Sequence, residues 1–212
     1  MDAELIEALR STVRALCRDF PPAYWRGLDR QKAYPTDFVA AMTKAGLRGA
    51  LIRESYGGGG LGLAAAAAIL EEVHASGGNA AALHAQMYTM GTVLRHGSQA
   101  QKDTWLPKIA DGSIRLQAFG VTEPTAGTDT TSISTFARRE GDTYVINGQK
   151  VWTSRAEHSD LMVLLARTTP KDQVARKADG LSVFLVDMRA AKGNGLTIKP
   201  IATMLNLSLI HI

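Results

Sequence analysis

The chain has 212 residues, of which 45% are hydrophobic and 21% are charged, so it can bury a core and is not expected to be disordered. Its formal net charge is only +4, and its Lys and Arg residues are dispersed, which argues against a dedicated nucleic-acid-binding surface. The single cysteine, Cys17, excludes a disulfide within the chain and a cysteine-based metal cluster. We expect Cys17 to be a small core residue.

The sequence carries no signal for a membrane or for secretion. No apolar run approaches the ~18 residues of a membrane-spanning helix. The start, MDAELIEALR, has acidic residues where a signal peptide has an apolar core. We therefore expect a cytoplasmic protein that does not enter a membrane.

Apolar residues at helical spacing predict a bundle of helices over the first 113 residues. Ser98 and Gln101 have the spacing of a capping box, which marks the start of the last helix. A loop that holds Tyr24 and Trp25 is predicted after the first helix. The predicted helices cover residues 4–18, 35–46, 61–76, 79–95 and 98–109.

From about residue 114 the pattern changes to short strands, with a hairpin turn at Gly141 and Asp142. The runs 160–167 and 181–187 are rich in Val and Leu and are predicted to be buried strands. These patterns predict an α+β multidomain chain. An N-terminal all-α helical bundle (1–113) is followed by an antiparallel β-barrel or sandwich domain (114–212). The predicted strands cover residues 114–121, 132–139, 143–148, 151–154, 160–167, 181–187 and 195–201.

Gly57, Gly59 and Gly62 match the spacing G-x-G-x-x-G of a dinucleotide-binding loop. That kind of site needs a strand before the glycines and an acidic residue about 20 residues later, at the end of a second strand. Here the next segment is another predicted helix, and residues 79–85 contain no acidic side chain. We therefore interpret the glycines as a tight bend between helices.

The most informative stretch runs from Phe119 to Ser154 and contains the motifs FGVTEPTAGTD and INGQKVWTS. An irregular loop leaves backbone N–H groups free for a ligand, and its threonines add hydroxyls that donate and accept. Trp152 offers a flat apolar face, and Ser154 adds a hydroxyl beside it. This combination fits one wall of a flavin site, but the same residue types also form ordinary loops, and a single Trp is more often part of a core.

The motifs themselves resemble those of a known family. FGVTEPTAGTD followed by YVINGQKVWTSRAEHSDLMVLLART closely resembles the signature of the acyl-CoA dehydrogenase family. The upstream HGSQAQKDTWLPKIADGSI and IRESYGGGGLGL resemble other stretches of that family, in the same order and spacing. The likeness covers roughly residues 36–206. The agreement of several motifs in order and spacing is far more specific than a match to a single motif.

The resemblance implies binding sites for FAD and for an acyl-CoA. Two departures stand out: the family often has Gly-Ala-Gly-Ser at residues 125–128 and Trp-Ile-Thr at residues 152–154. Both keep a hydroxyl at the last position, so cofactor binding is still expected, while substrate preference is left open. The implied flavin-contacting residues are Phe119, Val121, Thr122, Thr128, Trp152, Thr153 and Ser154. The implied substrate-lining residues are Thr128, Met87, Tyr88 and Met90; the last three are equally explained as core of the helical bundle.

The implied reaction is α,β-dehydrogenation of an acyl-CoA thioester, with hydride transfer to FAD and an electron-transfer flavoprotein as acceptor. The catalytic carboxylate of the family lies on a C-terminal four-helix domain of which this chain has nothing, so no catalytic residue and no metal ligand are assigned. Glu123 and Asp129 belong to the loop motif and are not expected to act as the base.

The end of the chain departs from the family. The terminal LSLIHI does not resemble it, so we interpret the β domain as incomplete and the gene end as truncated or misread. The full-length family member is expected to be a homotetramer. Two alternatives stay open: a flavin-dependent oxidase or monooxygenase of the same superfamily, and a non-catalytic remnant that binds flavin weakly or not at all.

Overall fold

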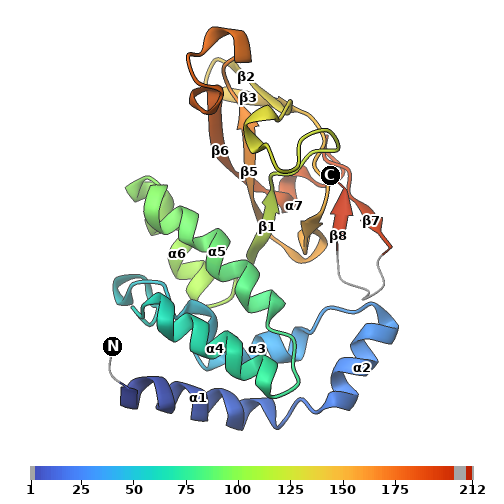
Figure 1. The fold of residues 1–212 in the computed structure, drawn as a ribbon. Coiled ribbons are helices and arrows are strands. Elements are labelled where there is room, and N and C mark those ends of the chain that lie inside the picture. Colours follow the sequence, from blue (N-terminus) through green and yellow to red (C-terminus); the bar gives the residue numbers. More distant parts are fainter. Residues whose placement is uncertain (1–2, 203–208, 212) are drawn as a thin grey trace. The chain divides into compact units, whose positions relative to one another are not determined.

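The computed structural model describes residues 3–202 and 209–211, and their contacts divide them into two compact units (Figure 1). The first unit holds residues 3–116, and the second holds residues 117–202 together with 209–211. The architecture is helical in the first unit and a mixed sheet in the second, which confirms the predicted fold class. The domain limits inferred from the sequence stay a prediction.

The first unit is built from helices joined by short turns, with two 3-10 turns between the third and fourth helices (Figure 1). Within the described residues, no helix is long and apolar enough to cross a membrane. The helices are α1 (Ala3–Cys17), α2 (Pro22–Gln31), α3 (Thr36–Lys44), α4 (Leu63–Ala75), α5 (Ala81–His96) and α6 (Gln99–Ala110).

The prediction of a loop around Tyr24 and Trp25 is wrong, because both residues lie in α2. Pro22 stands at the start of this helix, where proline has no N–H to lose and its fixed φ suits the first turn. The Trp25 indole Nε1 donates to the carbonyl of Phe20 at 3.0 Å and so ties the helix to the turn before it.

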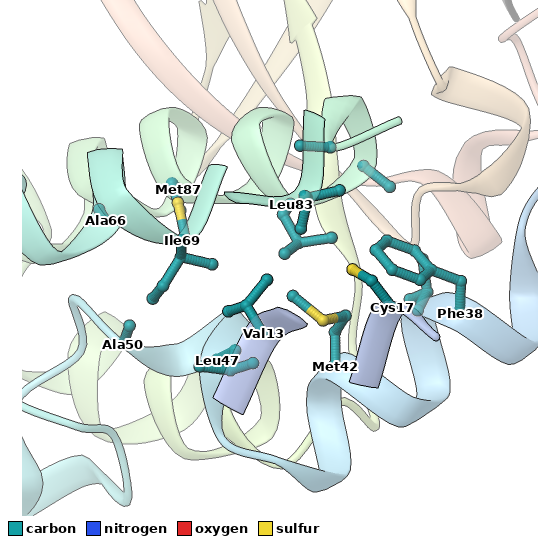
Figure 2. Close-up of a cluster of buried hydrophobic side chains, with 14 residues drawn as sticks. Val13, Cys17, Phe38, Met42, Leu47, Ala50, Ala66, Ile69, Leu83 and Met87 are labelled. Carbon is teal, nitrogen blue, oxygen red and sulfur yellow. The ribbon is translucent and has the colours of Figure 1, made fainter. Parts of the chain in front are cut away.

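The apolar stripes of α1, α3, α4 and α5 meet in one core (Figure 2). Val13, Phe38, Met42 and Ile69 are completely buried there. Cys17 is buried among them, which confirms its predicted role, and burial raises the pKa of its thiol. This unit is therefore held mainly by the removal of apolar surface from water.

The capping box predicted for α6 is confirmed. The Ser98 hydroxyl accepts from the Gln101 N–H at 3.2 Å, and the Gln101 side chain accepts from the Ser98 N–H at 2.8 Å. At α5 the N-cap residue is Ala80 rather than the predicted Asn79. The Asn79 side chain instead accepts from the Ala81 N–H at 2.9 Å, so it still holds a free donor of the first turn.

The glycine bend before α4 is structural. The Gly59 N–H donates to the Gly49 carbonyl at 3.1 Å, and the Gly60 N–H donates to the Ile52 carbonyl at 2.7 Å. A side chain on Gly58 would collide with the backbone of Ile52. These N–H groups are committed to the protein itself and are not free to bind a pyrophosphate, in agreement with the interpretation as a bend.

The second unit contains two sheets. In the larger sheet the strand order is β1-β5-β2-β3, and β6 pairs with β5 along its whole length. The smaller sheet has the order β4-β8-β7. The strands are β1 (Leu116–Gly120), β2 (Phe136–Glu140), β3 (Thr143–Asn147), β4 (Thr153–Ser154), β5 (Leu161–Arg167), β6 (Leu181–Asp187), β7 (Lys199–Ile201) and β8 (Leu209–His211).

The predicted hairpin is confirmed: β2 and β3 pair antiparallel around Gly141, whose φ of 61° suits a tight turn (Figure 1). β5 is buried as predicted, but the prediction that β6 is buried is wrong, because most of its side chains are half-buried and Val183 is exposed. β6 is the outer partner of β5, so its apolar run is only partly covered. Residues 207, 208 and 212 of the terminal LSLIHI lie outside the described residues, and 209–211 form β8.

Candidate functional site

The first segment of the candidate site starts at Phe119, near the end of β1, and continues into the loop that follows this strand. Phe119 is exposed on this strand, although its neighbours Ala118 and Gly120 are buried. A tight turn follows, in which Glu123 and Ala126 exchange backbone hydrogen bonds of 3.0 and 3.2 Å. The sequence Pro-Thr at the centre of this turn suits it, because proline fixes φ at a turn position.

The rest of the loop is shaped by Asp129. Its carboxylate accepts from the side chain of Ser132, from the Thr131 hydroxyl at 2.5 Å and from the Thr131 N–H at 3.1 Å. These hydrogen bonds, from Ser132 first and then Thr131, hold the pKa of Asp129 at about 2. The carboxylate caps the 3-10 turn Thr130–Ser132 and is committed to the loop.

The second segment is a bend at Trp152, between Lys150 and β4. Trp152 has a φ of 61°, and Arg155 just after β4 has a φ of 58°. Residues other than glycine rarely adopt this left-handed conformation, which costs about 1–3 kcal/mol and tends to cluster at functional sites. The bend leaves the Trp152 side chain 56% exposed, so a large apolar face is turned to the surface.

Direct bonds join the two segments. The Val151 N–H donates to the Thr122 carbonyl at 2.9 Å. The Lys150 ammonium donates to the Val121 carbonyl at 2.9 Å and to Glu123 Oε1 at 2.9 Å. The sequence prediction that these two bends lie next to each other agrees with these contacts.

The Glu123–Lys150 ion pair is almost completely buried, with each side chain 2% exposed. Burial would raise the pKa of Glu123, but hydrogen bonds from Ser134, Thr135 and Lys150 outweigh it and hold the pKa at about 2. A carboxylate in this state is ionised at neutral pH and has no free lone pair directed at a ligand. Glu123 is thus suited to holding the loop and not to proton abstraction.

The side-chain hydroxyls divide into two groups. Thr122 and Ser154 are half-buried and Thr128 is exposed, and within residues 3–202 and 209–211 their hydroxyls have no hydrogen-bond partner. They are free to bind a ligand. Thr153 is different, because its Oγ1 is completely buried and has no partner among the described residues. Its hydroxyl therefore does not face the surface, and a flavin contact of Thr153 stays a prediction.

Arg167, at the end of β5, was not identified from the sequence. Its guanidinium is buried and donates to the carbonyl oxygens of Thr131 at 2.8 Å, Lys177 at 3.2 Å and Thr169 at 3.4 Å. It fastens the far end of the candidate loop to residues 168–180. The only sequence signal was an arginine directly after a run of buried apolar residues, where a charge needs bonded partners.

Comparisons with known proteins decide the family. Residues 3–113 match the family model "Acyl-CoA dehydrogenase, N-terminal domain", and residues 118–209 match "Acyl-CoA dehydrogenase, middle domain". The chain belongs to the acyl-CoA dehydrogenase family.

Individual members of this family are similar over most of the chain. Acyl-CoA dehydrogenase FadE12 of Mycobacterium tuberculosis is 32% identical over 79% of this chain and 43% of its own length. The mitochondrial short-chain specific acyl-CoA dehydrogenase of Rattus norvegicus is 34% identical over 83% of this chain and 43% of its own length. The solved complex of glutaryl-coenzyme A dehydrogenase with glutaryl-CoA is 27% identical, with a TM-score of 0.87 over 100% of this chain and 53% of its own. The chain thus spans 43% of the length of the two curated relatives and 53% of the solved structure.

The helical unit of this family member has a groove of about 450 Å³ between α5 and the segment before α4. Met87 and Tyr88, two of the proposed substrate-lining residues, border it, although Met87 also belongs to the core cluster. Met90 does not border it and is 0% exposed, which favours the alternative that Met90 is bundle core. In the described residues there is no group of three or more His, Cys, Asp or Glu side chains that could hold a metal ion.

Proposed function

We propose that the second unit binds the isoalloxazine ring of FAD between the Thr122 and Trp152 segments, and that the protein acts in α,β-dehydrogenation of an acyl-CoA thioester. The observation that carries this proposal is the joining of the two segments by the Val151–Thr122 and Lys150–Glu123 bonds. That joining gathers free hydroxyls and an exposed indole on adjacent stretches of chain.

The residues present fit such a ring. An isoalloxazine has two apolar faces and a polar edge, so it needs a flat apolar neighbour and short donors and acceptors at fixed places. Trp152 and Phe119 supply exposed aromatic faces. Thr122, Thr128 and Ser154 supply hydroxyls without other partners among the described residues.

When bound, FAD would supply the acceptor for the hydride that leaves the β carbon of the acyl-CoA. The chain's own part is to bind and orient. The Trp152 indole would pack against the ring and exclude water, and the Thr122 and Ser154 hydroxyls would hydrogen-bond its polar edge. We assign the acyl chain to the groove beside Met87 and Tyr88 in the helical unit.

Proton abstraction needs a carboxylate with a pKa near the working pH. Glu123 and Asp129 do not meet this requirement, because each has a pKa held at about 2 and each is bonded to its own loop. Neither of these two carboxylates is therefore proposed as the base. An electron-transfer flavoprotein as acceptor and a tetrameric assembly complete the proposal at the level of the whole protein.

Titration of FAD into the purified chain, followed by flavin fluorescence, tests the proposal. We expect quenching on binding, and Trp152→Ala should raise the Kd about tenfold, since a buried aromatic contact contributes about 1–1.5 kcal/mol. The matched control is Tyr144→Ala, which removes another exposed aromatic side chain of the same unit. Equal affinity of the Trp152→Ala variant and the unaltered chain would contradict the proposed site. Absence of binding by the unaltered chain would favour the non-catalytic remnant.

A further inference from the structure

We propose that Glu123 and Lys150 are positioning residues that set the shape of the flavin site. Glu123 closes the neck of the loop 124–133, and Lys150 locks that neck to the Trp152 bend. This inference deepens the proposed function and rests on it. Neither residue is a candidate to contact the ring, since both side chains are buried.

The neck is closed by three of the four hydrogen bonds that the Glu123 carboxylate accepts, and the fourth comes from Lys150. Glu123 lies where the loop leaves, and Ser134 and Thr135 lie where it returns. Glu123 Oε2 accepts from the Ser134 N–H at 2.6 Å and from its hydroxyl at 2.8 Å. Glu123 Oε1 accepts from the Thr135 N–H at 2.8 Å and from Lys150 Nζ at 2.9 Å. Both ends of the loop are thus held by the same two oxygen atoms.

Lys150 connects this neck to the second segment. Its ammonium bonds the Val121 carbonyl as well as Glu123, and the following residue, Val151, bonds the Thr122 carbonyl. Residues 150–151 are therefore fixed in register with residues 121–123. Trp152 comes next, in a strained conformation that the surrounding bonds must hold in place.

The arrangement differs from the other ion pair of the loop. Lys177 Nζ lies 3.9 Å from Asp129 Oδ2. Both side chains are more than half exposed, so water and salt screen this pair. The Glu123–Lys150 pair is desolvated and takes part in five hydrogen bonds with defined partners. It can fix positions of the backbone, which the exposed pair cannot.

Three variants of the full chain separate positioning from plain stabilisation. Lys150→Met removes the ammonium but leaves Glu123 buried and unpaired. The double variant Glu123→Gln with Lys150→Met leaves no unpaired buried charge, keeps side chains of similar size, and serves if the single variant does not fold. Lys177→Met is the matched control, since it removes a lysine from the exposed pair of the same loop.

Amide hydrogen exchange, thermal unfolding and FAD titration are measured on each variant. We expect the double variant to unfold near the temperature of the unaltered chain, whereas the Val151 and Thr135 amides exchange about tenfold faster. For Thr135 that factor corresponds to the loss of one hydrogen bond to a charged group. Val151, whose N–H donates to the Thr122 carbonyl, should lose protection because Lys150 no longer holds residues 150–151 against residues 121–123. The Kd of the double variant for FAD should rise about tenfold. The Lys177→Met control should change neither the amide exchange rates nor the Kd for FAD.

The exchange measurement needs no flavin, so it separates this inference from the proposed function. If the unaltered chain does not bind FAD but Val151 and Thr135 lose protection in the double variant, the register role stands and the flavin proposal fails. If the double variant keeps both the amide protection and the FAD affinity, the pair only stabilises the fold and the inference is overturned.

Discussion

The core of the helical unit and the neck of the candidate loop are both buried, but they are held in different ways. Phe38, Met42 and Val13 contribute apolar area, which is a non-directional effect that tolerates small shifts of the side chains. Glu123 and Lys150 contribute hydrogen bonds with fixed directions to the backbone at residues 134–135 and at Val121. Substitutions in the core should therefore change stability alone, whereas substitutions in the neck should also change the position of the binding residues.

The largest expected effect comes from Phe38→Ala. Phe38 is 0% exposed and packs edge-on against Phe20 and Trp25, with ring centroids 5.3 and 4.9 Å apart. Its loss should lower the free energy of unfolding by about 3–5 kcal/mol, measured by denaturant unfolding. The comparison variant Phe119→Ala, at an exposed site, should cost less than about 1 kcal/mol but weaken FAD binding. The opposite ranking would break the contrast between the two regions.

The pH dependence of stability probes the neck. The folded pKa of Glu123 is about 2, below its ordinary value of 4.5, because of hydrogen bonds that outweigh burial. Glu123 therefore contributes at most ~3 kcal/mol to the free energy of unfolding. This contribution is fully present above about pH 4.5 and is lost as the pH falls towards 2. Asp129, which also has a pKa of about 2, acts with the same sign. Chemical unfolding between pH 2 and pH 6 should show a shallower decline in Glu123→Gln; an unchanged decline would show that Glu123 is not responsible.

The smallest expected effect concerns Thr153. Its Oγ1 is buried without a partner among the described residues, so Thr153→Val should raise the free energy of unfolding by about 1 kcal/mol. Affinity for FAD should not change, because the side chain is covered. Weaker FAD binding by this variant would contradict this and support Thr153 as one of the flavin-contacting residues.

Local patterns predicted what depends on local chemistry. The capping box of α6 and the β2–β3 hairpin follow from residues close in sequence, and both are present. The helix at Tyr24 was missed because a pair of prolines also marks the end of a helix, and the second one starts α2. The partial exposure of β6 was missed because apolar content does not reveal what covers a strand.

The candidate site was only half predictable for the same reason. Its surface residues stand in two recognisable motifs, so Thr122 and Trp152 could be proposed from the sequence. The supports behind them could not, since the partner of Glu123 is Lys150, 27 residues away. Arg167 donates a hydrogen bond to the carbonyl of Thr131, which lies 36 residues away in the sequence. Such pairings depend on strand register, which no local pattern fixes.

The central claim is that the Thr122 and Trp152 segments form one binding surface for the flavin ring. The most direct measurement is an NMR titration of the chain with FAD, following the amide signals of Thr122, Thr128, Trp152 and Ser154. The account predicts that both segments shift together, with one shared saturation curve, while the β2–β3 hairpin turn at Gly141 stays unchanged. Shifts confined to one segment, or signals in both that stay still while FAD binds elsewhere, would contradict it.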